Sequence, residues 1–207
     1  MASPTPRFEF RAFAQGFERV ETVLRARAGF PEITESRERY LLGTSGAAHN
    51  VKARDGHLEI KRRIEVRDGL ERWEPVARQA FPLPARFVSE ELLPELGCDA
   101  DPGDNATWTL DAFCAALRWP RGTLFVANVF KRRFRFELEG CPAEIDQLLV
   151  NGAAIRSAAV ESEDAVRLGS LVESLGLGGF ENVGYPLAWR RVLGLETWPG
   201  EEEGPDD

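Results

Sequence analysis

The sequence is poor in the residues that build disulfide frameworks and zinc sites. In 207 residues it has three cysteines, Cys98, Cys114 and Cys141, and two histidines, His49 and His57. The cysteines lie far apart and form no CxxC pair, which excludes a disulfide framework and a zinc knuckle. Two histidines are too few for a histidine-rich metal site. Reduced thiols of this kind are typical of a cytosolic protein.

The sequence also lacks long apolar runs and an excess of positive charge. Its N-terminal segment has no apolar signal core, and no apolar run approaches the length of a membrane span, so we expect a cytoplasmic protein with no membrane partner. The net charge of -8 argues against a binder of duplex nucleic acid, because such proteins carry a positive surface. The composition, 43% hydrophobic and 29% charged, excludes general disorder.

What the sequence does have is a strongly alternating segment, Phe130–Glu139. Side chains of a strand point to opposite faces in turn, so this pattern predicts a strand with one charged and one largely apolar face. Only Arg132 interrupts the apolar face. The charged face holds Lys131, Arg133, Arg135, Glu137 and Glu139.

The same alternation recurs in residues 7–14, 50–54 and 57–65, where Asp55-Gly56 predicts a tight hairpin turn between the last two. One such strand is most often the solvated face of an antiparallel sheet. Agreement among four strands favours a shared polar interior instead. The cations concerned are Arg7, Arg11, Lys52, Arg54, Lys61 and Arg63, in addition to those of the fourth strand.

The remaining pattern predicts further strands at 32–43, 71–81, 144–149 and 153–162, and helices at 15–28, 85–97, 107–118, 163–175 and 185–193. Asn151-Gly152 predicts a tight hairpin turn between the last two strands. About eight strands with few helices between them predict an α+β fold: a mainly antiparallel eight-stranded β-barrel, or tunnel, with peripheral helices. A barrel of this size can hold one small ligand in its interior. We expect a single domain over residues 1–198 and a disordered acidic tail over 199–207.

The charged residues of such an interior suit phosphate chemistry. Arginine forks and lysine ammonium groups match phosphate oxygens. Two pairs of carboxylates, Glu144 with Asp146 and Glu161 with Glu163, each share a strand face and suit Mg²⁺ or Mn²⁺. Cations for an anion and carboxylates for a metal are what phosphoryl transfer needs. Taken alone, Glu161 and Glu163 are more typical of a surface pair or of a helix N-terminus.

Four segments, in this order along the chain, carry a family resemblance. They are NVKARDGHLEIK at 50–61, FKRRFRFELE at 130–139, AVESED at 159–164 and NVGYP at 182–186. From about Arg7 to Gly194 the chain resembles the CYTH superfamily, the triphosphate tunnel metalloenzymes. The resemblance implies an eight-stranded antiparallel tunnel that binds a triphosphate together with Mg²⁺ or Mn²⁺. Activities of the superfamily include inorganic, thiamine and RNA 5′-triphosphatase and class IV adenylate cyclase.

The resemblance also implies roles for individual residues. The phosphate-binding residues carried over by position are Lys52, Arg54, Lys61, Lys131, Arg133 and Arg135, and the cations Arg7, Arg11 and Arg63 of the other charged strand faces are expected to bind phosphate as well. Of these, the catalytic residues are expected to be Lys52, Arg54 and Lys61. Expected metal ligands are Glu9, Asp146, Glu161 and Glu163.

One departure from the superfamily concerns its N-terminal ExExK motif. The matching positions here are Arg7, Glu9 and Arg11, so a cation stands where the first carboxylate is expected. This change favours anion binding and weakens the expected metal site.

Three hypotheses follow. The first is a divalent-metal-dependent hydrolase of a triphosphate-containing small molecule, either inorganic triphosphate or a nucleoside or thiamine triphosphate. The alternative is a non-catalytic CYTH-like protein that binds polyphosphate or a nucleotide. The third is an interaction protein whose charged sheet faces solvent around an apolar interior. The sequence leaves the substrate and a homodimer open.

Overall fold

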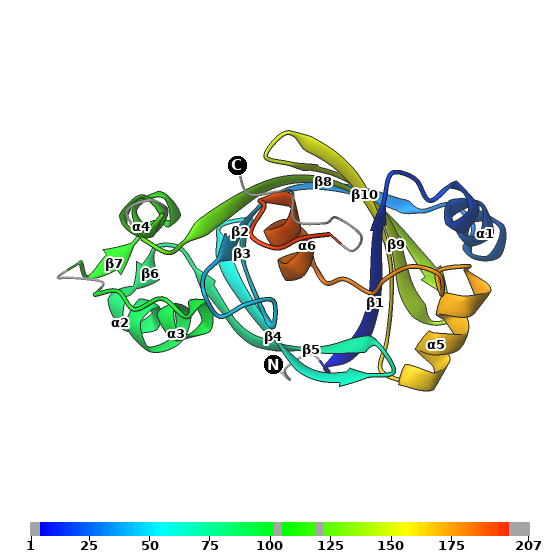
Figure 1. Cartoon of the computed structure of the whole chain (residues 1–207), viewed down its shortest axis with the longest axis horizontal. Coiled ribbons are helices and arrows are strands. Elements are labelled where there is room, and N and C mark those ends of the chain that lie inside the picture. The colour runs from blue at the N-terminus through cyan, green and yellow to red at the C-terminus, as the bar shows by residue number, and fades with distance from the viewer. Residues whose placement is uncertain (1–4, 102–104, 119–121, 199–207) are drawn as a thin grey trace, which may run out of the picture.

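A computed structural model of the chain describes residues 5–101, 105–118 and 122–198 (Figure 1). The strands are β1 Arg7–Ala14, β2 Glu32–Leu42, β3 His49–Arg54, β4 His57–Arg67, β5 Leu70–Ala80, β6 Leu83–Pro84, β7 Thr107–Trp108, β8 Phe125–Leu138, β9 Cys141–Val150 and β10 Ala153–Ser162. The helices are α1 Glu18–Ala28, α2 Ala85–Phe87, the π-helical turn η1 Val88–Leu92, α3 Leu93–Leu96, α4 Leu110–Leu117, α5 Ala165–Ser174 and α6 Tyr185–Val192.

Eight strands close into a barrel in the order β1-β10-β9-β8-β2-β3-β4-β5, and every neighbouring pair is antiparallel. The predicted fold class is therefore confirmed. Both predicted hairpin turns are present, since Asp55-Gly56 joins β3 to β4 and Asn151-Gly152 joins β9 to β10. All four of these turn residues have positive φ, as two-residue hairpin turns require.

Helices α1 and α5 cover the outer face of the barrel at β1, β8, β9 and β10 (Figure 1). Apolar side chains of these strands pack against the apolar faces of the two helices. Examples are Phe10, Ile145 and Val160 from the strands and Leu24 and Leu168 from the helices. Each side chain buried in this way contributes about 1.5–3 kcal/mol. Because strand residues alternate, burying the apolar face outside directs the charged face into the barrel.

Helix α6 fills one end of the barrel, and Figure 1 shows it inside the ring of strands. Tyr185 and Trp189 of this helix pack against Tyr40, Val129 and Leu148, which come from β2, β8 and β9. The segment before the helix is held on β1, where the backbone oxygen of Arg11 accepts a hydrogen bond of 2.7 Å from the amide of Val183. Helix α6 therefore closes the barrel interior at one end.

Residues between β5 and β8 form a smaller unit on the outside of the barrel. It contains β6, α2, η1, α3, β7 and α4, and its core includes Leu92, Trp108 and Phe113. This core continues onto Val51 and Ile60 of the β3–β4 hairpin. The helix predicted over 107–118 is shorter than expected, since its first two residues pair with β6.

None of the helices in the described ranges is both long and apolar enough to span a bilayer. The expected division into a single domain, 1–198, and an acidic tail, 199–207, stays a prediction, and the tail lies outside the described residues.

Candidate functional site

The barrel interior holds a cavity of about 610 Å³. Charged side chains from β1, β3, β4, β8, β9 and β10 line it, with Tyr185 of α6 beside them. Those charged residues are Arg7, Glu9, Arg11, Lys52, Arg54, Glu59, Lys61, Arg133, Arg135, Glu144 and Glu161, and Glu32 and Glu137 lie at its edge. The cations thus face inward. The hypothesis of an apolar interior with external cations is therefore wrong.

One side of the cavity is built around Arg11. We call it the β1–β10–β9 wall and define it by Glu9, Arg11, Glu144, Asp146 and Ser157. The registers of β1 on β10 and of β10 on β9 bring these residues to one face. The Arg11 side chain is 2% exposed.

All three nitrogens of the Arg11 guanidinium donate hydrogen bonds. Nε donates to Glu9 at 3.0 Å, and Nη2 donates to Glu144 at 2.6 Å. Nη1 donates to Asp146 at 3.1 Å, to Ser157 at 3.1 Å and to the Tyr185 hydroxyl at 2.8 Å. Charge-assisted hydrogen bonds of this kind are the strongest in proteins. Arg11 therefore holds three carboxyl groups of its own chain.

Burial and these contacts shift the pKa values of the acidic residues of this wall in different directions. Burial would raise the pKa of Glu144, but Arg11 and Arg133 hold the pKa well below its usual range. Arg11 and Lys61 likewise outweigh burial and lower the pKa of Glu9. Asp146 is fully buried beside Glu144, and both facts raise its pKa.

Glu161 differs from the other acids of the interior. It pairs directly across the strands with Glu9, and its nearest cation is Arg7, with 3.7 Å between Arg7 Nη1 and Glu161 Oε2. Burial raises the pKa of Glu161, and the charges of Glu9 and Glu144 raise it further. This carboxyl group therefore holds a proton more readily than Glu9 or Glu144, whose pKa values are lowered.

The opposite side of the cavity we call the β2–β3–β4 wall, defined by Glu38, Lys52, Arg54, Glu59 and Lys61. Lys52 Nζ lies 3.5 Å from Glu38 and 3.6 Å from Glu59. Arg54 donates to Glu59 at 3.1 Å, and its side chain is 27% exposed. Lys61 makes no ion pair with any residue of the described ranges. The cations of this wall are thus more open to a ligand than Arg11 is.

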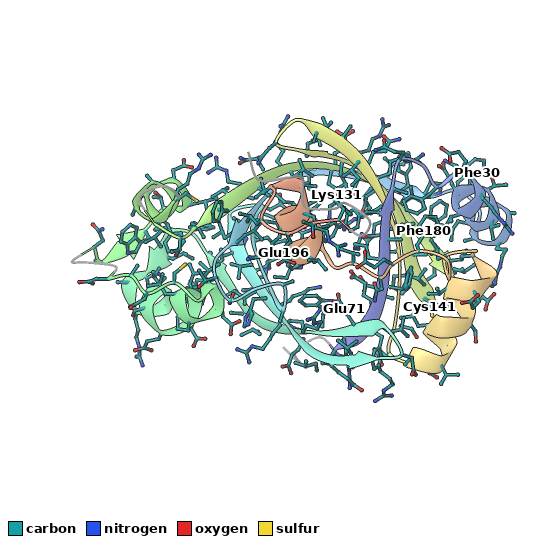
Figure 2. All side chains as sticks on the ribbon, viewed as in Figure 1. Phe30, Glu71, Lys131, Cys141, Phe180 and Glu196 are labelled. Carbon is teal, nitrogen blue, oxygen red and sulfur yellow. The ribbon has the colours of Figure 1, made fainter. Side chains whose placement is uncertain are left out.

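Two buried residues lie behind the cavity. Lys131 lies inside the ring of strands (Figure 2), with its Nζ 4.0 Å from the centre of the Tyr185 ring and 3.7 Å from Glu38. Burial lowers the pKa of Lys131 to about 8, although Asp146 and Glu38 oppose this change. Burial alone would raise the pKa of Glu38, but Lys131 and Lys52 hold it well below the usual range.

The predicted site residues fall into three groups. The cavity brings together ten of them: Arg7, Glu9, Arg11, Lys52, Arg54, Lys61, Arg133, Arg135 and Glu161 line it directly, and Asp146 lies just behind Arg11. Lys131 lies behind Tyr185, and Arg63 forms an ion pair with Glu71 and is not part of the cavity lining. Glu163 is exposed and lies beyond the end of β10, beside a smaller cavity near Arg7 and Glu161. The roles assigned to all of them stay predictions.

The expected metal ligands do not fit a divalent ion as they are arranged. Mg²⁺ needs about six oxygen ligands in a nearly octahedral shell. Glu9 and Asp146 already accept hydrogen bonds from Arg11, and Arg7 lies beside Glu161. Within the described part of the chain, no three acidic, histidine or cysteine side chains form a group that could hold a metal ion. We therefore derive no catalytic step through a metal.

The residues of the site that were not predicted include Glu38, Glu144 as a partner of Arg11, and Tyr185, together with Glu59 and Ser157. Glu38 could have been found, because it shares a strand face with Ser36 and Tyr40 in the same alternation that identified the other strands. The role of Tyr185 has no such signal. Its hydroxyl donates to Asp146, which depends on α6 lying inside the barrel.

No protein-family model and no curated protein sequence matches the chain. Among solved structures it is similar to a proposed adenylyl cyclase from Hippeastrum described as having a dominant triphosphatase activity. The TM-score is 0.54 at 12% identity, over 95% of this chain and 100% of that one.

Two further structures score lower. A proposed adenylate cyclase from Bacillus halodurans has a TM-score of 0.49 at 9% identity, over 86% of this chain and 93% of that one. A Mimivirus capping enzyme triphosphatase has a TM-score of 0.47 at 8% identity, over 84% of this chain and 89% of that one. With the closed eight-stranded barrel, the likeness to the Hippeastrum protein confirms the predicted tunnel fold, and at 12% identity it shows the fold alone.

Proposed function

We propose that the chain binds a triphosphate-containing small molecule in the barrel and hydrolyses it. One observation carries this proposal: cations from four strands of the barrel, β1, β3, β4 and β8, line a single cavity. A triphosphate is a chain of anionic groups, and several cations around a confined space match it better than any one surface pair would. Inorganic triphosphate and nucleoside or thiamine triphosphates are the substrates we propose to test.

The β2–β3–β4 wall supplies the binding groups in this proposal. Lys61, which makes no ion pair with a described residue, would meet the phosphate chain first. Lys52 and Arg54 would exchange carboxylate partners for phosphate oxygens, a replacement of one anion by another that leaves no cation unpaired. Arg133 and Arg135 of β8 would contact the phosphate groups from another part of the cavity lining.

These cations also account for a hydrolytic step. The negative charge that develops on a transferred phosphoryl group is stabilised by fixed cations aimed at it. In this proposal Lys52, Arg54 and Lys61 take this role. Glu161, whose pKa is raised by burial and by Glu9 and Glu144, is suited to accept a proton from the attacking water. The dominant triphosphatase activity described for the similar Hippeastrum protein supports the same reaction.

A second candidate function is binding without turnover. The observation that favours it is that Arg7 and Arg11 hold acidic groups that the superfamily resemblance assigns to a metal. In that case the protein would retain a polyphosphate or a nucleotide and release it unchanged.

One experiment separates these functions. Binding of tripolyphosphate, ATP and thiamine triphosphate is measured by calorimetry, and phosphate release from each is followed with Mg²⁺, with Mn²⁺ and with EDTA. Release from at least one substrate supports the hydrolase, and the same series tests the predicted metal requirement for turnover. Binding without release under all conditions supports the second candidate, while absence of binding to all three compounds refutes both.

A further inference from the structure

The acidic groups of the β1–β10–β9 wall surround a cation that belongs to the protein itself. Arg11 lies within hydrogen-bond distance of Glu9, Glu144 and Asp146, which come from β1 and β9. A group of carboxylates this close together needs a positive charge, because their mutual repulsion would otherwise favour protonation. In this chain the guanidinium supplies that charge.

The guanidinium is not easily displaced from this position. Its side chain is 2% exposed, and it donates through Nε, Nη1 and Nη2 to five acceptors. Two of these acceptors, Ser157 and the Tyr185 hydroxyl, are neutral and fix its orientation. A divalent ion would have to compete for these three carboxylates with a cation that is covalently part of the chain.

A second arginine, Arg7, lies at the edge of the same wall. Arg7 stands two residues before Glu9 on the same face of β1, and its guanidinium lies 3.7 Å from Glu161. The carboxylate pair formed by Glu9 and Glu161 is thus bounded by Arg11 on the inner side and Arg7 on the outer side. Each of these positions places positive charge where it would repel a metal ion.

We infer that Arg11, helped by Arg7, takes the place of a divalent metal ion, so that the barrel binds a triphosphate without one. This inference rests on the proposed function and concerns binding, not turnover. It predicts that the ligand is taken up as the free anion rather than as its metal complex.

The first test uses the unmodified full chain. Tripolyphosphate binding is measured by calorimetry with excess EDTA and with Mg²⁺, and Mn²⁺ binding to the ligand-free protein is measured by electron paramagnetic resonance. We expect the dissociation constant for tripolyphosphate to be no weaker in EDTA and the free protein to hold no Mn²⁺ below about millimolar concentration. Binding that requires Mg²⁺, or a tight Mn²⁺ site in the free protein, overturns the inference.

These outcomes are distinct from a failure of the proposed function. If tripolyphosphate binds under neither condition, the proposed function is refuted, and the Mn²⁺ titration of the free protein still decides whether Arg11 replaces a metal there.

The second test restores the missing acid. Arg7→Glu would place three carboxylates, at positions 7, 9 and 161, on neighbouring strand positions, and we expect this variant to gain Mn²⁺ binding by at least about tenfold over the unmodified chain. Arg156→Gln is the matched control, because Arg156 is a barrel arginine that pairs with Glu18 and Glu21 outside the cavity. No gain in Arg7→Glu, or an equal gain in Arg156→Gln, contradicts the role given to Arg7.

Discussion

The two walls of the cavity carry the same kinds of side chain and use them differently. In the β1–β10–β9 wall the central cation, Arg11, is buried and serves the acids of its own chain. In the β2–β3–β4 wall, Lys52 and Arg54 share the acids Glu38 and Glu59. Lys61 forms no ion pair within 4 Å among the described residues, although its charge lowers the pKa of Glu9. A charged barrel interior is therefore not uniformly a ligand site. The cation of one wall is bound to acids of its own chain, and the other wall is the one that we propose binds an anion.

The largest effect that separates the walls is expected from Arg11→Met. Among the residues that the structure describes, removing this guanidinium takes the ion-pair partner from Glu9 and leaves Glu144 and Asp146 with Arg133 alone. Breaking a buried ion pair from one side costs about 3–5 kcal/mol. We expect urea unfolding to show a loss of this size in the free energy of unfolding. Arg156→Met is the control, with an expected loss of about 1 kcal/mol or less. Equal losses in the two variants would mean that the β1–β10–β9 wall has no special structural role.

The next largest effect is expected from Lys61→Met, and it should fall on binding instead of stability. Lys61 stabilises no ion pair that the folded chain would lose, so the free energy of unfolding should change by less than about 1 kcal/mol. A charged hydrogen bond to phosphate contributes roughly 1.5–3 kcal/mol, so tripolyphosphate should bind about ten- to a hundredfold more weakly. Calorimetry measures this directly. Unchanged affinity would mean that Lys61 does not contact the ligand, and it would weaken the contrast between the two walls.

The sequence predicted only part of this contrast between the two walls. The alternation of residues 7–14, 50–65 and 130–139 predicted the inward faces, because a period of two is a local property of a strand. The tight turns at Asp55-Gly56 and Asn151-Gly152 fixed the two hairpins for the same reason. These local signals were enough for the barrel and for most of the cavity lining.

The role of Arg11 could not be predicted, because it depends on contacts between distant parts of the chain. Arg11 pairs with Ala159, and Ala159 pairs with Glu144, so the ion pair requires the order of three strands and their registers. The position of Tyr185 depends in turn on α6 entering the barrel. The sequence therefore predicted which residues face inward but not which of them are already bound to one another.

A smaller effect is expected where the two walls meet, at Tyr185. Its hydroxyl accepts from Arg11 and donates to Asp146, while its ring packs under Lys131. Tyr185→Phe keeps the ring and removes one buried hydrogen-bonding group, which costs about 1 kcal/mol when its partners keep other bonds. Asp146 keeps Ser157 and Arg11, so thermal unfolding should show only this modest loss. A loss as large as that of Arg11→Met would instead make Tyr185 the centre of the wall.

The smallest effect concerns the pH dependence of binding. Lys131 lies behind Tyr185 and does not touch the cavity, but its charge reaches a bound anion through the ring, and burial lowers its pKa to about 8. Below that pH the ammonium is charged and favours anion binding; above it the charge is lost. Between about pH 7 and 9 we therefore expect tripolyphosphate affinity to fall by roughly threefold, the size of a screened interaction across one side chain. Tripolyphosphate itself also loses protons between about pH 7 and 9, which changes its own charge. The measurement therefore needs a variant in which the ligand titrates in the same way but residue 131 does not. Lys131→Met is that variant, and its affinity should lack the decrease seen in the unmodified chain. If both proteins lose affinity equally, the fall belongs to the ligand or to the open cations of the β2–β3–β4 wall, and Lys131 serves only to neutralise Glu38 and Asp146.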